Sequence, residues 1–217
     1  AIFSSGVLME ILQQIGEALQ KGEHEKVAEL TQGGIDAGLS ATEILNDGLL
    51  PGMEVVGKRF GAHEIFLPEL LIAARAMNAG IDLLKPLFIK GEMPTQGKVV
   101  IGTVKGDLHD IGKNLVGIML KGAGYEVVDV GCDVTADVFV DTAEAEGAAV
   151  VGLSALLTTT MIGMKDVVEL VKSRGLQDRI KIVVGGAPLS KAFAEEIGAD
   201  AYGYDAGNAV EIVKELM

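Results

Sequence analysis

Apolar residues return every three or four positions through roughly the first 90 residues of the chain, which is the spacing of one buried helix face. Ser40 is followed three residues later by Glu43, the spacing of a capping box at a helix start. Pro68 stands where a first-turn proline belongs. The pattern therefore predicts helices over residues 7–20 and 24–37, from Ser40, from near Pro51, and from Pro68 to Leu84.

From Lys98 onward, short apolar runs rich in β-branched residues alternate with segments of helical spacing. This alternation predicts a doubly wound, five-stranded parallel sheet behind an N-terminal helical bundle. Strands are expected at 98–104, 125–130, 148–153, 180–184 and 201–204, and helices between them and at 207–216. The helix predicted at 111–121 places these apolar residues on one face: Ile111, Leu115, Ile118 and Met119.

The segment 88–97, FIKGEMPTQG, carries two glycines and a proline and is the best candidate for a linker. We therefore divide the chain into a helical domain at 1–90, a linker at 91–97 and an α/β domain at 98–217.

The charge and composition of the chain limit the kinds of partner it can bind. The 217 residues carry a net charge of −13, which argues against nucleic acid and anionic membrane, because both are bound through basic patches. No apolar run approaches the roughly 18 residues of a membrane span, and no signal peptide is visible. The single cysteine, Cys132, fits a reducing compartment, so a cytoplasmic protein is expected.

The chemistry of the chain is concentrated around His109, in the stretch GDLHDIG that follows the strand predicted at 98–104. Ligands of an open parallel sheet bind beyond the carboxyl ends of its strands, so His109 lies where a ligand is expected. A neutral imidazole is a good ligand for a transition metal, and a carboxylate on its second nitrogen fixes the tautomer. Asp107 and Asp110 are both candidates for that carboxylate.

Small residues end two later strands. The run at 148–153 is followed by Ser154, Ala155 and Leu156, and the run at 180–184 by Gly185 and Gly186. Such residues leave room for a bulky group to approach the backbone. Other cofactor motifs do not fit, because no G-x-G-x-x-G or G-x-S-x-G is present and the glycines near Gly112 do not have P-loop spacing.

The ordered set D-x-H-x-x-G, S-x-L and G-G resembles the cobalamin-binding domain of the methionine synthase and methylmalonyl-CoA mutase type, a Rossmann- or flavodoxin-like fold. The resemblance implies that His109 is the metal ligand, replacing dimethylbenzimidazole below the cobalt of cobalamin or a related corrinoid. The nucleotide tail then enters a slot beside the sheet. The residues implied to contact the cofactor are Gly106, Asp107, Leu108, His109, Asp110, Ile111, Gly112, Ser154, Leu156, Thr158, Gly185, Gly186 and Ala206.

The helical part carries a second resemblance. Residues 52–77, GMEVVGKRFGAHEIFLPELLIAARAM, are similar to the helical cap of methionine synthase and of corrinoid proteins in methylamine, methanol and methoxyarene methyltransferase systems. The resemblance implies that Phe66 shields the upper face of the cobalt. Leu70, Ala73 and Met77 follow at helical spacing and either complete this lid or pack in the bundle core, and the sequence does not decide between the two.

The two resemblances together imply a corrinoid methyl carrier that cycles between cobalt(I) and methylcobalt(III) and is not an enzyme by itself. A substrate-specific methyltransferase supplies the methyl group, a second methyltransferase passes it to a folate or a thiol, and a reductive activase rescues oxidised cobalt. Asp107 hydrogen-bonded to His109 tunes the ligand, and Thr160 stands where methionine synthase has a serine that completes the relay. The lid must open for transfer, so the bundle is expected to swing about residues 88–97.

Two other classes share parts of this layout. A cobalamin-binding sensor or regulator has a similar cap, but it needs an output domain, and the acidic charge opposes one that binds DNA. A mutase small subunit lacks the helical cap. The sequence names neither the methyl donor nor the acceptor.

Overall fold

The computed structural model describes residues 5–88 and 94–217. Its contacts divide the chain into two units, Ala1–Pro94 and Thr95–Met217, which we describe separately. The division falls inside the segment 88–97 that was expected to be a linker, and residues 89–93 of that segment lie outside the described residues. No helix in the two described ranges is long and apolar enough to cross a membrane.

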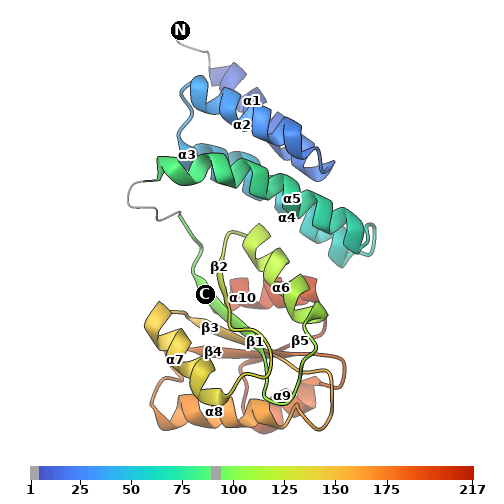
Figure 1. The fold of residues 1–217 in the computed structure, drawn as a ribbon, viewed down its shortest axis with the longest axis vertical. Helices are drawn as coiled ribbons and strands as arrows, with labels where there is room; N and C mark the ends of the chain where they lie inside the picture. Colours follow the sequence, from blue (N-terminus) through green and yellow to red (C-terminus); the bar gives the residue numbers. More distant parts are fainter. Residues whose placement is uncertain (1–4, 89–93) are drawn as a thin grey trace. The chain divides into compact units, whose positions relative to one another are not determined.

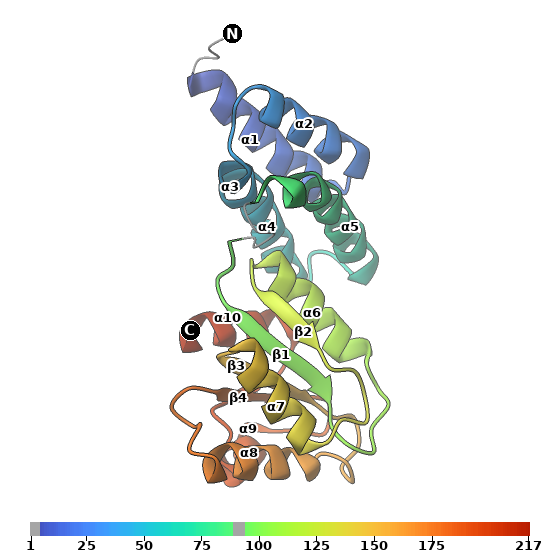
Figure 2. The same cartoon turned by 60° about the vertical axis from the view of Figure 1, so that its left-hand side comes forward.

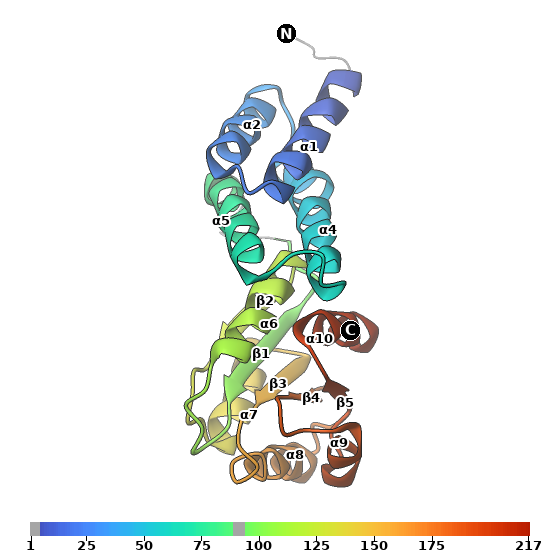
Figure 3. The same cartoon turned by 90° about the vertical axis from the view of Figure 1, so that its right-hand side faces the viewer.

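The N-terminal unit consists of helices. The pair α1 and α2 stacks on the pair α4 and α5 (Figure 3), and the apolar faces expected from the sequence meet between them, with Ile15, Leu19 and Leu70 fully buried. The elements are α1 (Ser5–Gln20), α2 (His24–Asp36), α3 (Ala41–Glu43), the π-helix η1 (Ile44–Leu49), α4 (Leu50–Gly61), α5 (Leu67–Leu84) and the 3₁₀ turn η2 (Lys85–Leu87).

The expected helix starts are confirmed at Ser40, near Pro51 and near Pro68. Ser40 forms the capping box with Glu43, which accepts a hydrogen bond from the Ser40 backbone N–H at 2.8 Å. Pro51 lies in the first turn of α4, which follows α3 and η1 without a break. Proline lacks a backbone N–H and crowds the carbonyl four residues back, and the wider π turn just before it accommodates this, with the Leu50 N–H reaching the carbonyl of Leu45.

The C-terminal unit confirms the doubly wound parallel sheet, with strand order β2-β1-β3-β4-β5 and every pairing parallel. Helices α6 and α10 pack together on one face, and α7, α8 and α9 cover the other (Figures 1 and 2). The strands are β1 (Lys98–Thr103), β2 (Glu126–Asp129), β3 (Val150–Ser154), β4 (Lys181–Gly185) and β5 (Ala201–Gly203). The helices are α6 (Ile111–Gly122), α7 (Ala136–Glu146), α8 (Gly163–Ser173), α9 (Lys191–Ile197) and α10 (Ala206–Leu216).

The register of the sheet brings the ends of four strands into one row. Thr103 pairs with Ser154, Ser154 with Gly185, and Gly185 with Gly203. The order of the strands reverses between β1 and β3, and ligands of such sheets bind at this switch point beyond the carboxyl ends. The loops that leave this row therefore form the expected binding edge.

Candidate functional site

The loop between β1 and α6 begins with a turn that only a residue free of a Cβ adopts easily. Gly106 has a φ of +83°, and its N–H donates to the Asp133 carboxylate at 2.7 Å. The backbone N–H of Asp133 in turn donates to the carbonyl of Asp107 at 3.0 Å. Asp133, from the loop after β2, thus fixes the start of the motif, and nothing in its local sequence indicated this role.

Asp107 is fully buried and lies at the centre of the site. One carboxylate oxygen, Oδ1, accepts hydrogen bonds from the backbone N–H of His109 at 3.0 Å and from its ring Nδ1 at 2.7 Å. The other, Oδ2, accepts from the Thr160 hydroxyl at 2.6 Å and from the backbone N–H groups of Leu156 and Leu157 at 2.8 and 3.3 Å. The carboxylate therefore joins the loops that follow β1 and β3.

These hydrogen bonds keep the carboxylate ionised in spite of its burial. Burial alone raises the pKa of Asp107, but the donors from Thr160, Leu156 and His109 outweigh it and lower the pKa well below the ordinary value. Asp107 is thus a fixed negative charge at neutral pH, and a negative acceptor holds a proton on the imidazole nitrogen that faces it.

His109 presents its other nitrogen to the surface. Because Nδ1 donates to Asp107, the lone pair of the neutral ring lies on Nε2, which has no hydrogen-bond partner among the residues that the structure describes. The side chain is 52% exposed. Of the two carboxylates left open by the sequence, Asp107 is therefore the partner, since Asp110 instead accepts from the Asn114 side chain at 3.0 Å.

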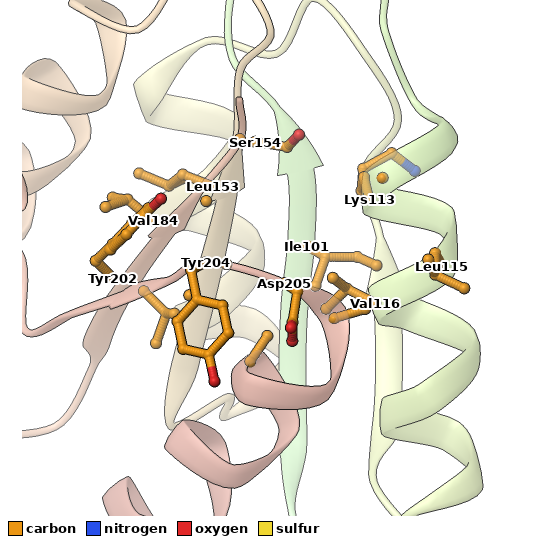
Figure 4. Close-up of a pocket in the computed structure, with 18 of the residues that line it drawn as sticks. Ile101, Lys113, Leu115, Val116, Leu153, Ser154, Val184, Tyr202, Tyr204 and Asp205 are labelled. Atoms are coloured by element: carbon orange, nitrogen blue, oxygen red, sulfur yellow. The ribbon is translucent and has the colours of Figure 1, made fainter. Parts of the chain in front are cut away.

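A cavity of about 450 Å³ lies beside the sheet, between its strands and the helices α6 and α10 (Figure 4). This volume is within the range of small-molecule sites. Five predicted cofactor contacts line it, namely Gly112, Ser154, Gly185, Gly186 and Ala206, whereas Leu156 and Thr158 do not. The lining residues that the sequence analysis missed include Ile101, Lys113, Val116, Gly152, Tyr202, Gly203, Tyr204, Asp205 and Ala209.

Two glycines that line the cavity differ in what surrounds them. A Cβ on Gly186, which has a φ of +138°, would collide with the backbone carbonyl of Ala155, so this position cannot carry a side chain without moving the loop. A Cβ on Gly112 would meet nothing within 4 Å, although Gly112 lines the cavity. The space beside Gly112 is therefore open for a ligand rather than filled by the protein.

Apolar side chains surround His109 at the surface. Leu108 and Ile111, which flank the loop, and Leu156 and Leu157, beyond β3, are all exposed. The expectation that Ile111 shares the apolar face of its helix is wrong, because Ile111 is 77% exposed and Lys113 is buried instead. An exposed apolar surface around a free imidazole nitrogen suits a large flat apolar ligand.

In the helical unit, Phe66 and the residues expected to join it are in different environments. Phe66 is 69% exposed, whereas Leu70, Ala73 and Met77 are buried. The expectation that they share one face is wrong because Phe66 precedes α5 in an extended conformation, so helical spacing does not start from it. Contact between Met77 and the cofactor stays a prediction.

The donor set fits a metal that brings most of its own ligands. In the described ranges, no three His, Cys, Asp or Glu side chains gather into a metal site. His109 supplies one imidazole whose other N–H is held by a carboxylate, the arrangement in which histidine usually ligates a metal. One imidazole nitrogen without a partner in the described part of the chain and an open slot in the same unit match the needs of a corrinoid, whose macrocycle would hold cobalt and whose tail would need a pocket.

Comparison with known proteins agrees with this geometry. Residues 97–213 match a family model described as a B12 binding domain, and residues 11–85 match a second model with the same description. A corrinoid protein of Desulfitobacterium hafniense is 42% identical over 97% of this chain and 99% of its own length. The dimethylamine corrinoid protein of Methanosarcina barkeri is 43% identical over 96% of this chain and 98% of its own.

This chain is also similar to a corrinoid protein of solved structure. A chain of the methanol:cobalamin methyltransferase complex MtaBC from Methanosarcina barkeri matches with a TM-score of 0.88 and 32% identity, covering 99% of this chain and 81% of that chain.

Proposed function

The chain belongs to the corrinoid proteins of methyltransferase systems, and we propose that it carries methyl groups between methyltransferases on a corrinoid held at His109. The observation that carries the proposal is the hydrogen-bonded chain from Thr160 through Asp107 to His109, which leaves Nε2 without a partner among the described residues. A slot that could take the cofactor's tail is lined by Gly112, three residues further along the chain. When bound, the corrinoid supplies a cobalt centre that accepts a methyl group and gives it up again.

The protein sets the position and basicity of the ligand nitrogen. The Nδ1 proton of His109 stays on the ring and points at Asp107 Oδ1, so the Nε2 lone pair would be available to the cobalt of a bound corrinoid. The negative charge of Asp107 makes Nε2 a stronger donor, and the Thr160 hydroxyl holds the carboxylate in place. The hydroxyl of Thr160 thus takes the role that the resemblance assigns to the serine of methionine synthase.

The slot takes the nucleotide tail that His109 displaces. Its lining is largely apolar, and Gly112 leaves space open in it. The surface formed by Leu108, Ile111 and neighbouring apolar residues supports the macrocycle. Desolvation of these side chains favours binding in proportion to the apolar area that is covered.

For the helical unit we propose the role of a cap. Phe66 is exposed at the start of α5 and is the aromatic residue we assign to shielding the methyl group. A capped cobalt is closed to partners, so we propose that the cap moves about the segment 88–97 to admit them.

The partners we propose follow from the relatives. One is a methyltransferase that takes the methyl group from a small methylated substrate, in the class of the dimethylamine and methanol named for the relatives. The second is a methyltransferase with a folate or thiol acceptor, and a reductive activase restores oxidised cobalt. A sensor or regulator is not favoured, because the relatives are corrinoid proteins for methylamines and methanol.

The test is coordination by a labelled nitrogen. The chain is labelled with ¹⁵N-histidine, loaded with cobalamin and reduced to cobalt(II), and electron paramagnetic resonance then reports which nitrogen binds the metal. We expect coupling to ¹⁵N, and its loss in His109→Ala together with weaker corrinoid binding. His63→Ala, in the helical unit, is the matched control. Coupling to the cofactor's own base, or coupling that survives His109→Ala, would contradict the assignment.

A further inference from the structure

Lys113 is a buried cation close to the site that the proposed chemistry does not use. It lies in the first turn of α6, and its side chain is 4% exposed. The ammonium group donates to Asp129 Oδ2 at 2.5 Å and to Asn114 Oδ1 at 2.7 Å. Its carbon stem lines the slot while the ammonium points away from it (Figure 4). Lys113 is therefore placed to hold protein groups rather than the tail.

One arm of this arrangement runs back to the motif through side chains of α6. The Asn114 amide that accepts from Lys113 donates through Nδ2 to the carboxylate of Asp110 at 3.0 Å. Asp110 directly follows His109 in the chain. Lys113 thus restrains the residue on the C-terminal side of the ligand.

The other arm reaches the same histidine through the sheet. Asp129, which ends β2, accepts from the Gly131 N–H at 2.9 Å, and the Gly131 carbonyl accepts from the Thr103 N–H at 2.9 Å. The Thr103 hydroxyl then donates to the carbonyl of His109 at 2.9 Å. Lys113 is thus connected to the backbone around His109 by two separate routes of hydrogen bonds.

We propose that Lys113 and Asp129 are positioning residues that clamp the backbone of His109 and so set the reach of Nε2 toward the metal. The inference rests on the proposed function of His109. Asp107 acts on the imidazole ring and on the His109 N–H, whereas this clamp acts on the His109 carbonyl and on the next residue. Ring orientation and backbone position are thus held by separate groups.

A purely structural ion pair behaves differently when it is dismantled. Removing one partner of a buried pair leaves an uncompensated charge, whereas replacing both is often neutral for stability. Asp129→Asn strands the buried ammonium, and Lys113→Met leaves an aspartate that is 38% exposed. The double variant removes both charges. Stability is therefore expected to be lowest in Asp129→Asn and to recover in the double variant, but the clamp is broken in all three.

The experiment uses the full chain labelled with ¹⁵N-histidine, loaded with cobalamin and reduced to cobalt(II) at neutral pH. Electron paramagnetic resonance gives the ratio of imidazole-bound to imidazole-free cobalt, and urea denaturation gives the free energy of unfolding. Lys98→Met and Glu126→Gln are the matched controls, because this pair, joined at 3.2 Å, lies at the other end of β2.

We expect all three clamp variants to retain corrinoid while the imidazole-bound ratio falls roughly tenfold, the factor that one hydrogen bond of about 1.4 kcal/mol represents. The controls keep the ratio of the unaltered protein. The clamp would be overturned if the ratio of imidazole-bound to imidazole-free cobalt recovered together with stability in the double variant. It would also be overturned if no variant changed that ratio. Absence of ¹⁵N coupling in the unaltered protein would overturn the assignment of His109 as ligand, and the clamp with it.

Discussion

Replacing Asp107 with asparagine should move the imidazole proton of His109 from Nδ1 to Nε2. The native carboxylate accepts five hydrogen bonds, of which two at Oδ2 come from backbone N–H groups that cannot reverse their direction. The amide oxygen of asparagine must therefore face those groups, and its NH₂ must face the ring of His109. A ring nitrogen that faces an NH₂ group has to accept, so the proton leaves Nδ1 and blocks the Nε2 lone pair.

The cost to stability follows from the same geometry. The backbone N–H of His109 donates to Oδ1 in the native site and would point at the NH₂ group, and an orphaned buried donor costs about 1–3 kcal/mol. The remaining hydrogen bonds lose the help of the charge. Together these losses lower the free energy of unfolding by roughly 2–4 kcal/mol. A typical protein has a free energy of unfolding of about 5–15 kcal/mol, so the variant should still fold.

The assay is ¹⁵N nuclear magnetic resonance of the imidazole nitrogens in the protein without corrinoid. The chain has three histidines, so His24 and His63 serve as internal references. We expect the Nδ1–H tautomer for His109 in the unaltered protein and the Nε2–H tautomer in Asp107→Asn. Loaded with cobalamin, the variant should keep the corrinoid but lose nitrogen coordination. An Nδ1–H tautomer in the variant, or coordination that persists, would refute the reasoning.

Three further substitutions test the site. Thr160→Val should lower the free energy of unfolding by about 1.5–3 kcal/mol at neutral pH. Folding lowers the pKa of Asp107, so urea denaturation should show the full difference between variant and native protein above pH about 4. The difference should shrink as the pH falls toward the pKa of Asp107 in the folded protein. Gly112→Leu should still fold, since a Cβ at this position meets nothing within 4 Å, and it should weaken corrinoid binding at least roughly tenfold in a spectral titration. Unchanged affinity would place the tail elsewhere. Gly186→Ala should lower the free energy of unfolding by about 1–3 kcal/mol through collision with Ala155, and equal thermal stability would disprove that strain.

Much of the fold was predictable because the three central strands, β1, β3 and β4, contain apolar runs rich in β-branched residues. The expected strand at 148–153 is observed as Val150–Ser154, and the expected helix at 207–216 as Ala206–Leu216. Such runs are buried on both faces in a parallel sheet, and no other arrangement hides them as well. The π-helix η1 escaped prediction because its hydrogen bonds, unlike its sequence, differ from those of an α-helix.

The chemical core of the site was predictable in part, because the residues around His109 are contiguous in the sequence. The choice of Asp107 over Asp110 came from the family resemblance alone, since both lie within two residues of His109 and only the three-dimensional path of the loop separates them. Lys113 was missed for a related reason. A lysine in an apolar helix is expected to be solvated, and its partner Asp129 is 16 residues away.

The arrangement explains how a loop can present a metal ligand with little freedom. Loops carry functional residues, but they are more mobile than the elements they connect, and a ligand nitrogen must be fixed in both orientation and position. In this chain a fully buried carboxylate orients the ring, and the row of strand ends supplies Thr103, which holds the backbone of the same residue. Both groups are anchored outside the loop, Asp107 by the turn that follows β3 and Thr103 by the sheet itself. The precision of the site therefore comes from the sheet register, and the loop only has to be long enough to reach between its two anchors.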